Sequence, residues 1–302
     1  MNKSIGSVFN AFVFVTVLLS GCAPASTPIP SNPIPATFTP EPTATPIPSP
    51  TPLPGLEALP LDTFGKSIPW LPMENSARPG SYYFLFNLSK PPFTNALVRQ
   101  AFAAAIDREA IVRIAQDLGV TNPRPATTFT PPETLGRDLY NAVGISFHPA
   151  DARQLLTQAG YTDLANFPPV TLITNPGPEG VNAKIGEEMI RMWQIYLGVN
   201  VTLEIVAEKY FNRVQTDPTE IFFSNWAADY NDPDDFLLEN FHTGSQYNYN
   251  HFSNLEFDDV VDRAATASDP AVRQELYIQA ERILCETEVA LIPIYHTTLN
   301  IP

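Results

Sequence analysis

An alternation of strand and helix patterns constrains the fold of this chain more than any other feature. Residues 170–174 form a short apolar run that predicts a strand. Residues 185–197 carry apolar side chains at helical spacing, and Gly198 ends the predicted helix. Residues 199–205 then alternate apolar and polar side chains, as a half-buried strand does. Strands and helices in this order favour a layered α/β fold.

The alternation extends over most of the chain. Thr94 and Asp107 are suitable caps for two successive helices, and Pro293 places the last strand at an edge or a bulge. Residues 123–132 are expected to form a loop. The other predicted strands are residues 81–87, 221–223 and 290–295, and the other predicted helices are residues 94–106, 107–118, 149–160, 208–214, a segment after Asp235, and 270–287. We therefore expect an α/β layer fold with a mixed sheet.

The first 22 residues have the pattern of an export signal. Lys3 supplies the positive start, residues 8–19 are almost entirely apolar, and small residues lead to Cys22. The last four residues resemble a bacterial lipoprotein box, which implies cleavage before Cys22 and lipidation of its thiol. The alternative is an ordinary secretory signal in which Cys22 is incidental.

Residues 23–60 are dominated by Pro, Thr, Ser and Ala and predict a disordered linker. Such a chain reaches on the order of 100 Å when extended, so it suits a tether between a membrane and a folded domain. Residues 61–302 have enough apolar side chains for that domain. Only Cys285 remains outside the signal, and its apolar surroundings predict a small core residue rather than a reactive thiol.

The charge of the chain is strongly acidic, with 32 Asp and Glu against 17 Lys and Arg. No basic cluster interrupts this excess, which argues against a nucleic-acid partner and against charge-driven binding to anionic lipid. Acidity alone selects no other ligand.

The segment from Asn225 to Asp258 is the candidate site. It follows the apolar run at residues 221–223, so Trp226 and Asp229 are expected where a strand ends and a loop opens. A carboxylate among aromatic side chains suits a cation, because the rings exclude water around a charged acceptor. The alternative is an ordinary turn in which Asp232, Asp234 and Asp235 begin a helix and interact with its dipole. We prefer that alternative for these three residues, and the site for Asp229.

Metal and enzyme motifs fail on spacing. Counted from Asp229, a calcium loop needs an oxygen ligand where Pro233 stands, Gly where Asp234 stands, and Glu where Asn240 stands. No catalytic residues are predicted, since Ser146 lacks the second Gly of a nucleophile elbow. No cofactor and no metal are expected, because no close pair exists among His148, His242, His251 and His296.

Several separated motifs carry a family resemblance. They resemble those of bacterial extracellular solute-binding proteins of family 5, the oligopeptide and dipeptide receptors of ABC importers. The motifs are Phe86-Asn87, Pro91-Pro92-Phe93, the run from Val98 to Arg108, the run from Ala152 to Tyr161, the segment from Trp226 to Asp235, the run from Ser253 to Asp258, and Ile292-Pro293-Ile294-Tyr295. The resemblance implies a type II periplasmic-binding-protein lobe, tethered outside the cytoplasm, that passes oligopeptide to an ABC permease.

The resemblance also implies roles for individual residues. Asp229 occupies the position that pairs with the ammonium of a bound peptide, and Trp226 forms a wall. The backbone from Ser224 to Ala227 is expected to add the peptide as a strand, and Asn225 and Ala227 are candidate contact residues. Tyr230 belongs to the same segment. Asn248 and Asn250 are further candidates for ligand contact, with a surface loop as the alternative.

The chain departs from the family pattern at its N-terminal half, where the linker stands in place of most of one lobe. A single lobe offers half of the contacts and no enclosure, so weak binding is expected. Strand residues 82–86 and 291–295 are then expected to be exposed. The second hypothesis is an interaction or sensory module, or a nonfunctional remnant, that no longer captures solute.

Overall fold

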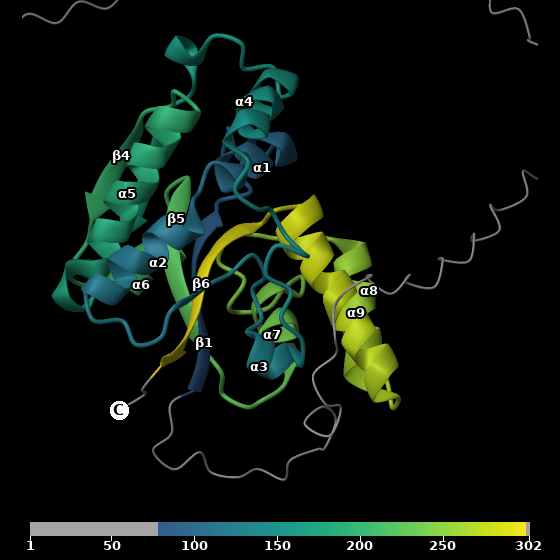
Figure 1. Cartoon of the computed structure of the whole chain (residues 1–302). Helices are drawn as coiled ribbons and strands as arrows, with labels where there is room; N and C mark the ends of the chain where they lie inside the picture. Colours follow the sequence, from purple (N-terminus) through teal and green to yellow (C-terminus); the bar gives the residue numbers. More distant parts are fainter. Residues whose placement is uncertain (1–77, 300–302) are drawn as a thin grey trace, which may run out of the picture. The chain divides into compact units, whose positions relative to one another are not determined.

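The computed structural model describes residues 78–299, which form a mixed six-stranded sheet with helices on both faces (Figure 1). The expected mixed α/β fold is confirmed. The strands are β1 (Arg78–Phe86), β2 (Arg124–Pro125), β3 (Val170–Thr174), β4 (Val201–Ile205), β5 (Ile221–Ala227) and β6 (Leu291–Leu299). The helices are α1 (Ala96–Ala104), α2 (Arg108–Asp117), α3 (Pro132–Leu135), α4 (Pro149–Gln158), α5 (Val181–Tyr196), α6 (Tyr210–Thr216), α7 (Leu237–Phe241), α8 (Leu255–Thr266) and α9 (Pro270–Arg282). The predicted signal, Cys22 and the linker lie outside the described residues.

The sheet has the order β2-β6-β1-β5-β3-β4, with β1 near its centre. Strand β1 pairs antiparallel with both β6 and β5, although these neighbours come from distant parts of the chain. Strand β3 pairs parallel with β4 and β5, because α5 carries the chain back between β3 and β4. The two halves of the sheet therefore meet at β5.

Successive side chains of β1 and β5 point to opposite faces of the sheet. Tyr82 lies opposite Asn225 on one face, and Ser81 lies opposite Trp226 on the other. Figure 1 shows α2 and α5 on one side of the sheet and α3, α7 and α9 on the other. The Tyr82 hydroxyl lies 3.2 Å from Asn182 Oδ1 of α5, so the face shared by Tyr82 and Asn225 is the one that α5 covers. The direction of each site residue follows from this register.

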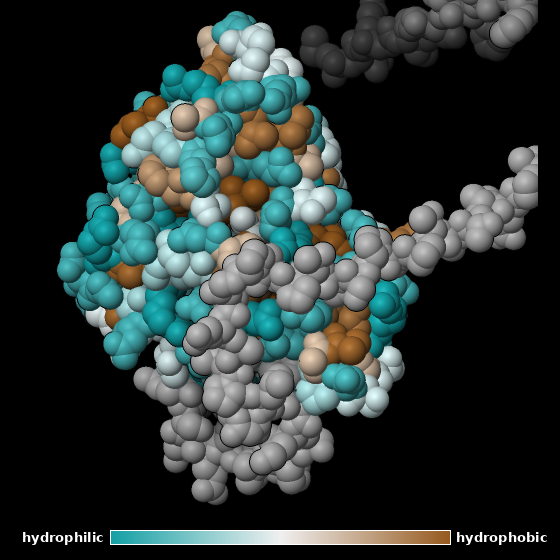
Figure 2. Space-filling model, turned by 45° about the vertical axis from the view of Figure 1, so that its right-hand side comes forward, coloured by the Kyte–Doolittle hydropathy of each residue, from teal (hydrophilic) through white to brown (hydrophobic). Residues whose placement is uncertain are grey.

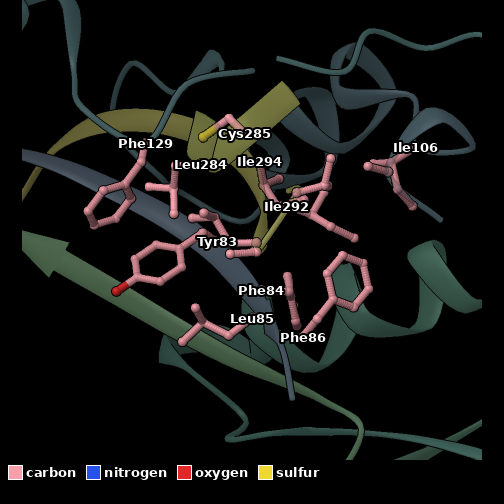
Figure 3. Packing of buried hydrophobic residues seen from close by; sticks show 14 of the residues in the cluster. Tyr83, Phe84, Leu85, Phe86, Ile106, Phe129, Leu284, Cys285, Ile292 and Ile294 are labelled. Atoms are coloured by element: carbon pink, nitrogen blue, oxygen red, sulfur yellow. The ribbon is translucent and has the colours of Figure 1, made fainter. Parts of the chain in front are cut away.

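Both faces of the central strands are buried, so the expected exposure of residues 82–86 and 291–295 is wrong. Every side chain of β1 from Tyr82 to Phe86 is at most 6% exposed. On one face Tyr82 stacks on Tyr295 with ring centroids 4.5 Å apart. On the other face Tyr83 meets the edge of Phe129 at 4.8 Å (Figure 3). Helices and loops of the same lobe supply this cover.

Few large apolar side chains remain at the surface of the described residues. The view in Figure 2 is mainly hydrophilic, with hydrophobic residues scattered over it. The exposed large hydrophobics are Ile195, Ile205, Phe211, Tyr230, Leu255 and Val272. None of the described helices is long and apolar enough to cross a membrane.

Local sequence signals predicted most of the ends of the helices and strands. Asp107 caps α2 by accepting from Ala110 N, as expected, and the π-helical turn Ile283–Thr287 continues α9 to its predicted end. Asn95 caps α1 in place of Thr94, because its carboxamide oxygen reaches Leu97 N at 2.9 Å. Pro293 lies at a shift in register between β6 and β1, so of the two expected alternatives, an edge or a bulge, the structure shows the bulge.

Other expectations were incomplete. Strand β1 begins three residues before the predicted start and ends at Phe86, and α6 begins two residues late, at Tyr210. The segment expected to be a loop contains β2, which pairs with β6 through Arg124 and Pro125. Strand β5 continues four residues beyond its apolar run, because β1 pairs with it as far as Ala227.

Candidate ligand-binding site

An open edge on β5 is the central feature of the site. Strand β3 pairs with β5 only at Ile221 and Phe222 and then diverges. The Tyr210 hydroxyl lies between β3 and β5 where they separate. It is 3.2 Å from the carbonyl oxygen of Ile173 and 2.7 Å from the carbonyl oxygen of Phe223. Beyond Phe223, the described residues provide no strand partner on this side of β5.

The register shows which backbone groups point to the open edge. Ala228 N donates to Pro79 O at 2.8 Å, so even-numbered residues of this segment face β1. Phe223 O faces Tyr210 instead, and backbone groups alternate sides along a strand. The N–H and C=O groups of Asn225 and Ala227 therefore point to the open edge. These are two of the predicted site residues.

A cavity of about 440 Å³ lies on the face of the sheet that carries Asn225. The Tyr82 hydroxyl is 3.2 Å from Asn182 Oδ1 at its wall, and Asn182 Nδ2 donates to Asn175 Oδ1 at 2.6 Å. The residues that line the cavity are Ser81, Tyr82, Leu118, Gly119, Val120, Thr121, Pro178, Val181, Asn182, Phe223, Asn225, Tyr295, Thr297 and Thr298. Its volume falls within the usual range for small-molecule sites.

Trp226 lies on the opposite face and does not line this cavity. Its ring meets Tyr247 at 5.1 Å, and its indole Nε1 donates to Asp235 Oδ2 at 3.1 Å. The structure thus places Asn225 and Trp226 on different sides of the open edge. A segment bound along that edge meets one of them on each face.

Asp229 follows the end of β5 by two residues, as expected, and its side chain is 68% exposed. Its Oδ1 accepts from Arg78 Nη1 at 3.3 Å, and the same nitrogen is 3.3 Å from Ala228 O. The carboxylate is thus already paired with a cation from the start of β1. Such an exposed pair contributes under about 1 kcal/mol to stability, because solvent screens it.

Asp235 fixes the geometry of this loop. Its side chain is 1% exposed, and its Oδ2 accepts from both Trp226 Nε1 and Asp229 N at 3.1 Å. Burial raises the pKa of the Asp235 carboxyl to about 7, against the lowering effect of those two donors. Sequence reasoning assigned Asp235 to a helix start and missed this role. The one available signal was its place in the same motif as Trp226 and Asp229.

The neighbouring aspartates serve the turn. Asp232 Oδ1 accepts from Asp234 N at 3.1 Å, which is the capping role expected for it. Asp232 also binds Arg273 of α9 through both oxygens, at 2.5 and 2.8 Å. Burial and the adjacent Asp232 charge raise the pKa of Asp234 to about 6. The cluster therefore anchors the loop to α9.

The three remaining predicted residues lie apart from the cavity. Tyr230 is 39% exposed. Asn248 holds its own loop, donating to Phe252 O at 2.7 Å and accepting from Phe252 N at 2.9 Å. Asn250 is fully buried and donates to Ala290 O at 2.9 Å. Ligand contact by these residues stays a prediction, and the burial of Asn250 gives it no support.

The described residues contain no group of three or more His, Cys, Asp or Glu side chains that could hold a metal ion.

Two buried side chains lie apart from the site. Nε2 of His296 lies 3.0 Å from the carbonyl oxygen of Thr128, and burial lowers the pKa of His296 to about 4. Cys285 is 1% exposed, which confirms it as a core residue, and burial raises the pKa of its thiol.

The described residues thus combine an open strand edge with an adjoining cavity, an arrangement that suits a bound ligand. The model of bacterial extracellular solute-binding proteins, family 5 Middle, matches residues 46–248. The chain belongs to this family.

Relatives of known role agree with this assignment. The chain is 30% identical over 245 residues to the periplasmic oligopeptide-binding protein OppA of Salmonella typhimurium, covering 79% of this chain and 44% of the relative. It is 33% identical over 230 residues to the probable deoxycholate-binding periplasmic protein YgiS of Escherichia coli, covering 74% of this chain and 41% of the relative. The chain thus spans less than half the length of these relatives.

Solved structures show the same fold. The murein tripeptide binding protein MppA of Escherichia coli matches with a TM-score of 0.62 and 29% identity, over 74% of this chain and 43% of that one. The structural match, like the sequence matches, is to solute-binding proteins rather than to enzymes.

Proposed function

We propose that this chain binds oligopeptides outside the cytoplasm for an ABC importer. The observation that carries the proposal is the open edge of β5, where Asn225 and Ala227 present free backbone donors and acceptors beside a cavity. An extended peptide is the ligand that pairs with such an edge. The names of OppA and MppA support this ligand class, whereas YgiS is named as a probable deoxycholate-binding protein.

Asp229 is the proposed acceptor for the amino end of the peptide. It lies two residues beyond Ala227, so a strand paired with Asn225 and Ala227 ends near its carboxylate. The Arg78 guanidinium pairs with that carboxylate in the structure, and the ammonium of an incoming peptide displaces it. Because Asp229 is well exposed, we expect weak binding in the high micromolar range.

The first prediction tests this contact. Wild type should bind a free-amine tetrapeptide about 3- to 10-fold more tightly than its N-acetylated twin, because acetylation removes the ammonium that pairs with Asp229. Asp229→Asn should remove that difference. Isothermal titration calorimetry of both proteins with both peptides measures it.

Asp217→Asn is the matched control, since Asp217 is equally exposed and pairs with Arg213 away from the site. It should keep the wild-type preference. Equal binding of the two peptides to the wild type would exclude the ammonium contact. Failure of either peptide to bind at millimolar concentration would favour the interaction or sensory module instead.

The second prediction concerns Arg78. Arg78→Gln should strengthen binding of the free-amine peptide about two- to fivefold, because the ammonium no longer competes with a guanidinium for Asp229. The N-acetylated peptide should be unaffected, which makes it the internal control in the same titration. A gain for both peptides would instead indicate an effect on the strand edge.

We also propose that a lipid on Cys22 anchors the chain to a membrane, where it delivers solute to a permease. Support comes from the box that precedes Cys22 and from the proline-rich segment that follows it. As the third prediction, Cys22→Ser should move most of the protein from the membrane fraction to the soluble fraction. Immunoblotting of the fractions measures this. A wild type that is already soluble would contradict the anchor.

A further inference from the structure

The described residues contribute no charged side chain to the wall of the cavity beside Asn225. The chain carries 17 Lys and Arg and 32 Asp and Glu. None of them, and no histidine, is among the described residues that line the cavity. Because a buried charge needs a partner, this wall offers nothing to neutralise a charged group that enters it.

The chemistry of the wall suits flat and apolar groups with a polar tip. The Tyr82 ring stacks on that of Tyr295, and its centroid lies 4.7 Å from the ring centroid of Phe223. Asn182 and Asn225 supply amide donors and acceptors. Burial raises the pKa of both Tyr82 and Tyr295, so their hydroxyls stay neutral. The part of the wall that the structure describes therefore carries dipoles and aromatic rings but no net charge.

The open edge directs one ligand side chain to this cavity. Paired residues on neighbouring strands have their side chains on the same face of a sheet. A ligand residue that pairs with Asn225 therefore points to the face where the cavity lies. Its two neighbours along the ligand point to the opposite face, beside Trp226.

We propose that this cavity selects peptides with an uncharged side chain at the residue that pairs with Asn225. The proposal rests on the peptide-binding function and specifies which peptides are bound. Aromatic and aliphatic side chains fit best, because they bury apolar area without desolvating a charge. An acidic side chain is disfavoured most, since the chain carries 32 Asp and Glu against 17 Lys and Arg, and this excess of negative charge repels it.

Asn182 is the residue that sets this selectivity. It is 6% exposed, and its amide is fixed by Tyr82 on one side and Asn175 on the other. Gly177 packs so closely that a Cβ there would lie 2.5 Å from Asn182 Cγ. Asn182→Asp adds one negative charge to the wall at almost constant volume, so it should admit a cationic side chain.

The fourth prediction is tested with tetra-alanine peptides that have a free amino end. Each carries Phe, Lys or Glu at one of the four positions, and titration calorimetry gives the affinity for the wild-type protein. At one position Phe should bind at least 10-fold more tightly than Glu, with Lys between them. At each of the other positions, the affinities of the Phe, Lys and Glu peptides should agree within about threefold.

The variant Asn182→Asp should raise the ratio of Lys to Phe affinity at that position at least 10-fold, because a buried ion pair replaces an unpaired charge. Asn212→Asp is the matched control, since it adds the same charge at an exposed site on α6. An equal change in both variants would overturn the role of Asn182, because it would reflect overall charge.

Two outcomes separate this proposal from the function on which it rests. Glu binding as tightly as Phe at every position, while tetra-alanine itself binds, would overturn the selectivity alone. Failure of every peptide to bind would overturn both the selectivity and the peptide-binding function.

Discussion

Replacing Glu281 with alanine should lower the free energy of unfolding by about 3 to 5 kcal/mol. The Glu281 side chain is fully buried, and its two oxygens accept from Phe129 N at 2.8 Å and Thr130 N at 2.7 Å. Alanine leaves both donors buried without a partner, at about 1 to 3 kcal/mol for each. The ring of Phe129 packs on Tyr83 of the central strand, so the loss extends to the core (Figure 3).

Urea denaturation followed by circular dichroism measures this change. Glu256→Ala is the control, because Glu256 is exposed in the first turn of α8 and should cost under about 1 kcal/mol. Glu281→Gln keeps one acceptor oxygen, so its free energy of unfolding should lie between those of the wild type and Glu281→Ala. This variant can still be measured if Glu281→Ala does not fold. Equal losses for Glu281→Ala and Glu256→Ala would show that the two backbone donors find other partners.

The fold was predictable where one segment contains its own signal. Residues 170–174 form β3 as expected, because a short apolar run needs no distant partner to be recognised. Asp107 and Pro149 begin α2 and α4 for the same local reason. Helix α8 was not predicted, although Asn254 caps it through Phe257 N; residues 253–258 were noted only as a family motif.

Long-range pairing accounts for what was missed. Residues 224–227 are too polar to predict a strand, yet β1 holds them in one from more than 100 positions away. The burial of β1 was also misjudged, because the packing of Phe129 on Tyr83 joins a loop and a strand that are unrelated in sequence. Periodicity gives the buried face of a segment but does not identify what covers it.

The candidate site, like the fold, was predictable only where the sequence signal is local. Asp229 was placed correctly after the end of β5, because the apolar run and the loop adjoin it. Its partner Arg78 lies 151 positions away and carries no local signal. The cavity was not predicted, since its wall gathers residues from β1, β5, β6, α5 and the segment after α2.

The pH dependence of stability should report directly on Asp235. Burial, the largest cause, raises its folded-state pKa to about 7, and the unfolded value is about 3.9. Below pH 4 the carboxyl is protonated in both states, so the folded state is not penalised. As pH rises from about 4 to 7 the unfolded state loses this proton first, and stability falls by on the order of 2 to 4 kcal/mol.

Asp235→Asn should remove this part of the pH dependence while keeping the loop in place. Trp226 Nε1 and Asp229 N both donate to one oxygen, Oδ2, so an amide oxygen at that position can accept from both. The variant should therefore be more stable than wild type at pH 8, by about 2 kcal/mol, and no more stable at pH 4. Urea denaturation at several pH values measures the difference.

Subtracting the two curves cancels the carboxyls that do not interact with Asp235. Asp234, whose pKa is raised to about 6, remains in both proteins, and its charge also raises the pKa of Asp235, so the difference reports on Asp235 together with this neighbour. Asp217→Asn is the control, since it removes one exposed carboxylate far from this loop and should lack the gain in stability at pH 8 that is expected for Asp235→Asn. Parallel curves for Asp235→Asn and wild type would mean that the Asp235 carboxylate is ionised in the folded state throughout this range. The donors from Trp226 and Asp229 would then outweigh its burial, and the loop that carries Asp229 would be held by a charge-assisted contact at every pH tested.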